Sequence, residues 1–299
     1  MSVLTFVFLR LIPGDAIAAR LGTSTALTPE QTAHLRAFFG IDQPLHVQYL
    51  SWLGSLAHGD AGYSIRSGQP VTLEIASRLP VTLEMALLAG VLALLVGVPL
   101  GLVSALRPNS APDLAARGFG LLGLALPNFW LGTLVILLFA RYLRWMPNTG
   151  GYVDFTTDPL ANLRFLLFPA ATLGVAMAAV VMRTARSAML DVLGTDYIRT
   201  ARAKGLPGSR VVQRHALKNG LIVVVTILGI QVGYLLGGAV VVEEVFSVPG
   251  IGRLLLNAIT QRDYALVQGA VLVIATLFVA MNTLVDVVYG YLDPRIRFS

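Results

Sequence analysis

Long apolar segments alternate with polar ones along the chain, and their lengths predict membrane-spanning helices. Five of the apolar segments approach the ~20 residues that a helix needs to cross the hydrocarbon core of a bilayer. They run over residues 80–106, 118–143, 166–182, 221–242 and 267–290. We therefore expect five membrane spans, three of which are kinked or ended by Pro99, Pro127 and Pro169.

The segment before these spans is apolar but too short to cross a bilayer. Residues 1–13 have about half the needed length and lack the positive cluster of a secretory signal. We interpret them as the second half of a first span that begins before this chain, so that the full architecture has six helices. Residues 14–78 mix glycine, proline and polar residues with short amphipathic stretches at 29–39 and 44–56, and we expect them to fold on the outer surface.

Composition supports a multi-span membrane protein. Hydrophobic residues make up 56% of the chain and charged residues 13%, with a mean hydropathy of +0.73, whereas a soluble domain has roughly a quarter of its residues charged. The net charge of +6 does not indicate nucleic-acid binding, because basic membrane proteins hold their cations in cytoplasmic loops. The chain has no cysteine, which excludes disulfides and thiolate metal sites.

The distribution of positive charge predicts the orientation. The loop at residues 183–220 carries eight basic residues against two acidic ones, and burying eight cations at the bilayer centre would cost roughly 20 kcal/mol or more. This loop is therefore expected in water on the cytoplasmic side. Alternation then places the short loop with Arg107 and Arg117 and the tail at 291–299 inside, and residues 14–78 outside. The eight basic residues are Arg183, Arg186, Arg199, Arg202, Lys204, Arg210, Arg214 and Lys218.

The cationic loop carries the signals of a short helix. Thr195 or Asp196 can cap its first amides, and good helix formers continue to Lys204. Gly205 stands where a left-handed residue ends a helix, and Ser209 can cap a second helix that leads into the fifth span.

This helix allows two interpretations. Tyr197, Ala201 and Lys204 are expected to share one face, and Ala201 and Ala203 are small enough to let another surface approach the backbone. The helix could therefore enter a groove on a partner. It could also be no more than the surface helix of a positively charged loop.

The loop sequence RTARAKGL resembles the EAA coupling loop of ABC transporter permeases, in the form found in dipeptide, oligopeptide and nickel importers. The resemblance covers nearly the whole chain, because many short motifs follow in the same order. They are RLIPGD at 10–15, GIDQPLHVQY at 40–49, HGDAGYS at 58–64, RLPVTLEMALLA at 78–89, ALPNFWLG at 125–132, VVEEVFSVPGIGRLL at 241–255, RDYALVQG at 262–269 and LVDVVYGYLDPRIR at 284–297.

The resemblance implies an all-α permease subunit with the transmembrane bundle of a type I ABC importer, in the cytoplasmic (inner) membrane of a bacterium or archaeon. It also implies two ABC ATPase subunits, a second homologous permease subunit and an extracytoplasmic solute-binding protein as partners. The implied cargo is a di- or oligopeptide or a similar small solute, with nickel as the alternative. The implied ATPase-coupling residues are Tyr197, Arg199, Thr200, Ala201, Arg202, Ala203, Lys204, Gly205 and Leu206.

The loop departs from the general EAA pattern at its acidic position. The pattern's Glu, Ala, Ala and Gly fall on Arg199, Thr200, Ala201 and Gly205, so only the last alanine and the glycine match. A coupling mechanism that needs a carboxylate at this place is therefore in doubt.

Signals for enzyme chemistry are missing. No G-x-x-x-x-G-K-[ST] motif occurs, and the two lysines are Lys204 and Lys218, so we expect ATP to be hydrolysed by a partner. No H-E-x-x-H or G-x-S-x-G motif occurs either. Three histidines in the outer region, His34, His46 and His58, raise the idea of a metal site, but we expect them to be solvated, with no metal and no cofactor bound.

Glycine repeats in the spans predict close helix packing. Gly97 and Gly101 form one G-x-x-x-G repeat, and Gly229, Gly233 and Gly237 form two more. Missing side chains let helix backbones approach each other, so we favour packing over a direct role in binding cargo.

Four polar residues within the spans are candidates for the translocation path. They are Asn128, Gln231, Tyr234 and Asn282, and an unpaired polar group is costly at membrane depth. Hydrogen bonding between helices is an equally good interpretation for the first three of these residues.

Two other classes of protein remain as alternatives. A secondary transporter or channel that works without an ATPase should show several ionisable residues in mid-span and an internal repeat, and we find neither. A membrane-bound enzyme should show a nucleophile, a metal set or a pair of carboxylates in a cluster, and none is evident.

Overall fold

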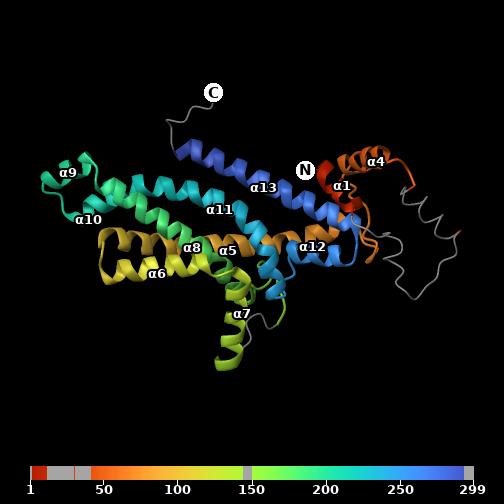
Figure 1. Ribbon diagram of the computed structural model, residues 1–299, viewed down its shortest axis with the longest axis horizontal. Helices are drawn as coiled ribbons and strands as arrows, with labels where there is room; N and C mark the ends of the chain where they lie inside the picture. Colours follow the sequence, from red (N-terminus) through yellow and green to blue (C-terminus); the bar gives the residue numbers. More distant parts are fainter. Residues whose placement is uncertain (1, 12–29, 31–41, 144–149, 293–299) are drawn as a thin grey trace. The chain divides into compact units, whose positions relative to one another are not determined.

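A computed structural model describes residues 2–11, 30, 42–143 and 150–292 (Figure 1). Regular structure in this part of the chain is helical, apart from an isolated antiparallel bridge between Tyr63 and Pro70. The helices are α1 (Ser2–Leu11), α4 (Leu45–Ala57), α5 (Val71–Leu106), α6 (Ala111–Ala125), α7 (Asn128–Leu138), α8 (Pro159–Leu193), α9 (Asp196–Ala203), α10 (Gly208–Val211), α11 (Leu217–Val245), α12 (Ile251–Thr260) and α13 (Tyr264–Leu292). Short π-helical segments, Phe139–Leu143 and Val212–Ala216, follow α7 and precede α11.

The long helices overlap the predicted apolar segments. α5, α8, α11 and α13 are long and apolar enough to cross a membrane, and the pair α6 and α7 supplies a fifth span if it counts as one. The apolar stretch at residues 1–13 contains α1, and the stretch at 44–56 forms α4. The stretch at 29–39 lies almost entirely outside the described residues.

The predicted span at 118–143 is broken at Leu126 and Pro127, where the sequence analysis expects proline to kink or end a helix. α6 and α7 are bent by 106° at this break. Leu126 is extended, with φ −88° and ψ 122°, since the ring of a following proline disfavours the helical conformation. Pro127 then stands at the N-cap of α7, where its missing N–H costs nothing. Pro99 and Pro169, in contrast, lie inside α5 and α8 and do not end them.

Contacts along the chain divide it into two compact units. One comprises Met1–Val81 and Pro249–Leu277, and the other comprises Thr82–Val248 and Phe278–Ser299. α5 and α13 each contribute to both units.

The first unit is built on apolar contacts between the start of α5 and the start of α13. Val71, Ile75, Leu266 and Val267 are buried in one cluster. Gly269 allows this approach, because a Cβ at its position would lie 2.5 Å from a methyl group of Val71.

The second unit is organised around α8. The most hydrophobic stretch of α8 is 67% buried, whereas those of the other long helices are only 22% to 28% buried. α8 therefore forms the centre of this unit, and the neighbouring helices keep wide apolar faces exposed.

Gly97 and Gly101 bring α5 against the backbone of α8, as the glycine repeat predicted. A Cβ at Gly97 would lie 2.7 Å from the carbonyl oxygen of Ala178, and one at Gly101 would lie 2.6 Å from that of Met182. In the repeat on α11, Gly229 and Gly233 face Val285 and Phe278, but Gly237 faces open space.

Replacing Gly101 with alanine is expected to destabilise the folded bundle by about 1–3 kcal/mol, the usual cost of overpacking. The new Cβ would also meet the Cβ of Ala185 at 2.7 Å. Gly90→Ala is the matched control on the same helix, because nothing lies within 4 Å of its Cβ position. Thermal unfolding of the purified variants measures the difference, and equal melting temperatures would contradict the close contact.

A hydrogen-bonded cluster joins α5, α8 and the loop that precedes α8. Glu84 accepts hydrogen bonds from the Tyr152 hydroxyl at 3.0 Å and from Asn162 Nδ2 at 2.8 Å. Burial, together with the adjacent Glu84, raises the pKa of Tyr152, so the hydroxyl keeps its proton and remains a donor. The cluster thereby fixes the first turn of α8 against α5.

Candidate functional site

The short helix predicted in the cationic loop is present as α9. Two residues separate it from the end of α8, and the second of them, Thr195, stands at its N-cap in an extended conformation. The Thr195 hydroxyl donates back to the carbonyl of Val192 at 2.6 Å and does not cap the helix. Asp196 in the first turn and Arg202 in the last turn both complement the helix dipole.

Gly205 ends the helix as the sequence predicted. Its φ is +76°, in the left-handed region that favours glycine. Its N–H donates to the carbonyl of Arg202 at 2.9 Å, and the N–H of Leu206 donates to that of Ala201 at 3.4 Å. These bonds satisfy carbonyls that the end of a helix leaves without a partner, and they turn the chain towards α10.

Two residues of α9 pack it against the rest of the second unit. Ile198 is fully buried and Ala201 is 7% exposed, in a cluster with residues from four other segments. The other members are Ala105 at the end of α5, Met189 on α8, Val211 on α10 and Ala216 just before α11. α9 is thus held against the ends of three long helices.

The face predicted for α9 is partly wrong. Tyr197 and Lys204 are exposed, as expected, but Ala201 points into the chain's own core. Of the two small residues proposed to admit another surface, Ala203 alone is exposed. Ala201 has to be small because it packs inside this cluster.

The remaining residues of α9 present a polar, cationic surface. Arg199, Thr200, Arg202 and Lys204 are exposed, and Leu206 is half-buried against the apolar cluster. Arg199 lies 3.2 Å from Asp196, but both side chains are largely exposed, so this pair adds little stability. The Arg199 guanidinium can therefore exchange this partner for another.

Tyr197 has a different setting from the other exposed residues. Its hydroxyl accepts a hydrogen bond from Asn219 Nδ2 at 2.9 Å. Asn219 lies in the first turn of α11, so this bond is a second tie between α9 and that helix.

A buried charge pair near the inner ends of the helices escaped the sequence reasoning. Asp113 on α6 is fully buried and lies 3.0 Å from Arg186 Nε on α8. Arg186 also donates to Ser104 on α5 at 2.9 Å, and the N–H of Asn109 donates to Asp113 at 2.9 Å. Arg117 Nε lies 3.6 Å from the same carboxylate. One carboxylate thus joins α5, α6 and α8.

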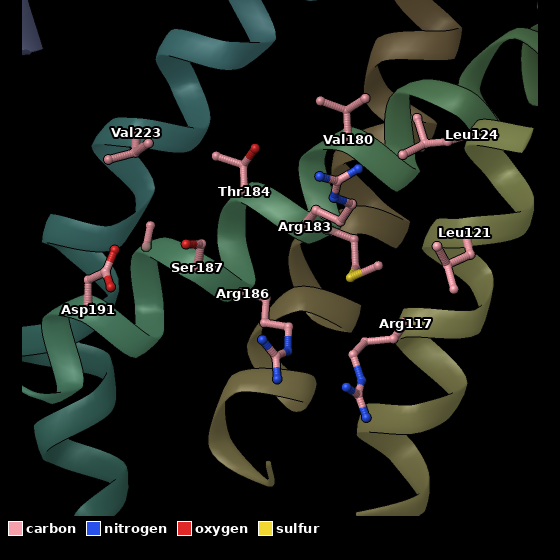
Figure 2. Close-up of a pocket in the computed structure, with 12 residues that line it drawn as sticks. Arg117, Leu121, Leu124, Val180, Arg183, Thr184, Arg186, Ser187, Asp191 and Val223 are labelled. Carbon is pink, nitrogen blue, oxygen red and sulfur yellow. The ribbon is translucent and has the colours of Figure 1, made fainter. Parts of the chain in front are cut away.

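A pocket of about 890 Å³ opens beside this pair, between α6, α8 and α11 (Figure 2). Arg117, Arg183 and Arg186 line it together with one acidic residue, Asp191. Leucine and valine side chains from all three helices form its apolar wall.

The candidates for the translocation path are not brought together with this pocket. Its lining, as far as the structure describes it, includes none of Asn128, Gln231 and Asn282. Asn128 Nδ2 lies 3.5 Å from the Cβ position of Gly238 on α11, and Asn282 Nδ2 lies equally close to that of Gly233. Asn282 donates to the Phe278 carbonyl of its own helix at 2.8 Å.

Gln231 is half-buried on α11. The side chain of Tyr234 lies outside the described residues.

Comparison with known proteins decides the family. The family described as "Binding-protein-dependent transport system inner membrane component" matches residues 97–298, and its N-terminal counterpart matches residues 1–86. The chain belongs to this family. It is therefore a multi-pass permease of the inner membrane, as the sequence predicted.

Relatives in this permease family align over the full chain. The dipeptide transport system permease protein DppB of Escherichia coli (strain K12) is 40% identical, covering 99% of this chain and 94% of its own length. A Brucella abortus (strain 2308) protein named for a peptide transport system permease is 43% identical over 299 residues. This match covers 100% of this chain and 94% of the relative.

Solved structures confirm the predicted fold class of this permease. An inward-facing form of the MetNI methionine ABC transporter matches with a TM-score of 0.59 at 16% identity, covering 74% of this chain and 97% of that one. An amino acid ABC transporter with histidines matches with a TM-score of 0.51 at 17% identity. The match covers 75% of this chain and 95% of that one. The chain therefore has the fold of ABC importer transmembrane subunits.

Proposed function

We propose that this permease imports peptides and is driven by two ATPase subunits that dock on α9. The observation that carries the proposal is the two-sided character of α9. Its inner face is buried among the ends of three long helices, while its outer face is cationic and exposed.

The geometry suggests how movement would pass from α9 into the bundle. α8 continues into α9 through Gly194 and Thr195 alone, so the two helices are joined by a short connection. Ile198 packs into the same cluster as Met189 and Ala216, on either side of the loop. Because packed interiors resist compression, a displacement of α9 would shift the ends of α8 and α11 with it.

A peptide cargo is supported by the names of the relatives and by their alignment over the full length of this chain. For nickel, the alternative, no group of three or more His, Cys, Asp or Glu in the described part of the chain is arranged to hold a metal ion. His34 lies outside the described residues, and His58 is bonded to the carbonyl of Gly54 at 2.8 Å. We infer that a solute-binding protein delivers the peptide from outside and that a second homologous permease subunit completes the path.

Arg199→Glu tests the docking of α9. Reversal of this exposed charge is expected to leave membrane insertion intact and to abolish peptide uptake, because the cationic face would meet the ATPase subunit with the wrong sign. Uptake of a labelled peptide and co-purification of the ATPase subunits measure the two effects. Arg164→Glu, at the exposed outer part of α8, is the matched control. Normal uptake by Arg199→Glu would count against the role of α9.

For the translocation path, Gln231, Tyr234, Asn128 and Asn282 remain our proposed residues. The chain has no cysteine, so Gln231→Cys and Tyr234→Cys each introduce a unique thiol. Their labelling rates are expected to change when substrate or ATP is added, because access to the path alternates. Rates that never respond would remove these two residues from the path.

A further inference from the structure

The pocket between α6, α8 and α11 has an excess of positive charge that nothing in the proposed mechanism uses. Asp113, which is not part of the lining, lies close to both Arg186 and Arg117 and offsets one of these two positive charges. Arg183 forms no ion pair within the described residues, and Asp191 is the one acidic side chain in the lining. Figure 2 shows Arg117 and Arg186 at one end of the pocket and the guanidinium group of Arg183 further along it, beside Val180.

Two of these arginines stand at the ends of apolar segments. Arg117 directly precedes the apolar segment 118–143, and Arg183 directly follows the apolar segment 166–182. Two neighbouring helices thus each carry an arginine at the same boundary of the bilayer. With the cationic loop on the cytoplasmic side, this boundary is the headgroup level of the inner leaflet.

Apolar side chains continue the pocket from these arginines towards the bilayer centre. Leu121 and Leu124 lie one and two turns further along α6, and Val180 lies one turn before Arg183 on α8. Leu121 is 70% exposed and Leu124 is 42% exposed, so this wall is open. The pocket thus offers both cations for a phosphate and an exposed apolar wall for an acyl chain, the two parts of a phospholipid.

We propose that this pocket binds an anionic phospholipid of the inner leaflet. The phosphate binds at Arg183, whose planar guanidinium group suits phosphate oxygens, and Arg117 adds its positive charge at the end of the pocket. One acyl chain lies along Leu121 and Leu124. Arg186 remains paired with Asp113, and its positive charge adds to the attraction of the pocket for the phosphate. A free phosphate would use the arginines but would leave the apolar wall without a role, which favours the lipid.

The test measures lipid retained by the purified transporter, with its partner subunits, from mixed phosphatidylglycerol and phosphatidylcholine. Native mass spectrometry is expected to show preferential retention of phosphatidylglycerol. Arg183→Gln should lower that retention about fivefold, the effect of one cation near an anionic membrane surface. Arg164→Gln is the matched control, since it removes an exposed arginine from the outer part of the same helix. Its retention should equal that of the wild type.

Three results would overturn the proposal. Equal retention of both lipids by the wild type would exclude selectivity for the anionic headgroup, and unchanged retention in Arg183→Gln would exclude this pocket. Displacement of phosphatidylglycerol by millimolar glycerol phosphate would show that a soluble anion suffices. A photoreactive residue at position 121 adds an independent check. Cross-links to lipid support the proposal, and cross-links to the second permease subunit alone contradict it.

Discussion

Replacement of Gly205 by proline is expected to abolish uptake while the chain still inserts into the membrane. Proline fixes φ near −65°, whereas Gly205 has a φ of +76°. Proline also removes the N–H that donates to the carbonyl of Arg202. The end of α9 could then not form, and Leu206 would lose its place against the apolar cluster.

Gly208→Pro provides the control within the same loop. Gly208 is the first residue of α10, a position that accepts proline, and Pro207 before it is already extended. Peptide uptake and the amount of protein in the membrane are measured for both variants. Full uptake by Gly205→Pro, or equal loss in both variants, would show that the turn at 205 has no special part in coupling.

The second large effect is expected from Ile198→Asp, which places a carboxylate where the side chain is fully buried. An unpaired charge in an apolar cluster costs on the order of several kcal/mol, so α9 should detach from the ends of the long helices. ATP hydrolysis by the partner subunits would then proceed without uptake. Reconstituted vesicles allow both rates to be measured in the same sample.

Ile198→Val separates this effect from general damage. It removes one methylene at a cost of about 0.5–1.5 kcal/mol and keeps the cluster apolar, so uptake should stay close to that of the wild type. Uptake by Ile198→Asp at the wild-type rate would mean that the attachment of α9 is not needed.

Local features of the fold could be predicted from the sequence. The lengths of the apolar segments predicted the long helices, because the thickness of the bilayer sets the length of a membrane-spanning helix. The left-handed conformation of Gly205 could be predicted, and so could the close helix contact at Gly97 and Gly101. Both features depend on the absence of a side chain. Pro127 indicated a break, although not the 106° bend between α6 and α7.

The features that escaped prediction depend on contacts distant in sequence. Asp113 and Arg186 are 73 positions apart, and no signal in a single sequence pairs them. Ile198 is an apolar residue in a mostly polar helix, and its role is visible only with Met189 and Ala216 beside it. The assignment of Ala201 to an outer face failed for the same reason. The pocket likewise appears only when α6, α8 and α11 are assembled.

Cross-linking from α9 tests the central claim most directly. Ala203 is exposed on α9 and the chain has no cysteine, so Ala203→Cys supplies one thiol at the proposed contact. In membranes that contain the whole transporter, a short bifunctional reagent is expected to join this thiol to an ATPase subunit, with a yield that changes on addition of ATP. No cross-link to an ATPase subunit, or labelling of the thiol by an impermeant reagent from outside intact cells, would contradict the account.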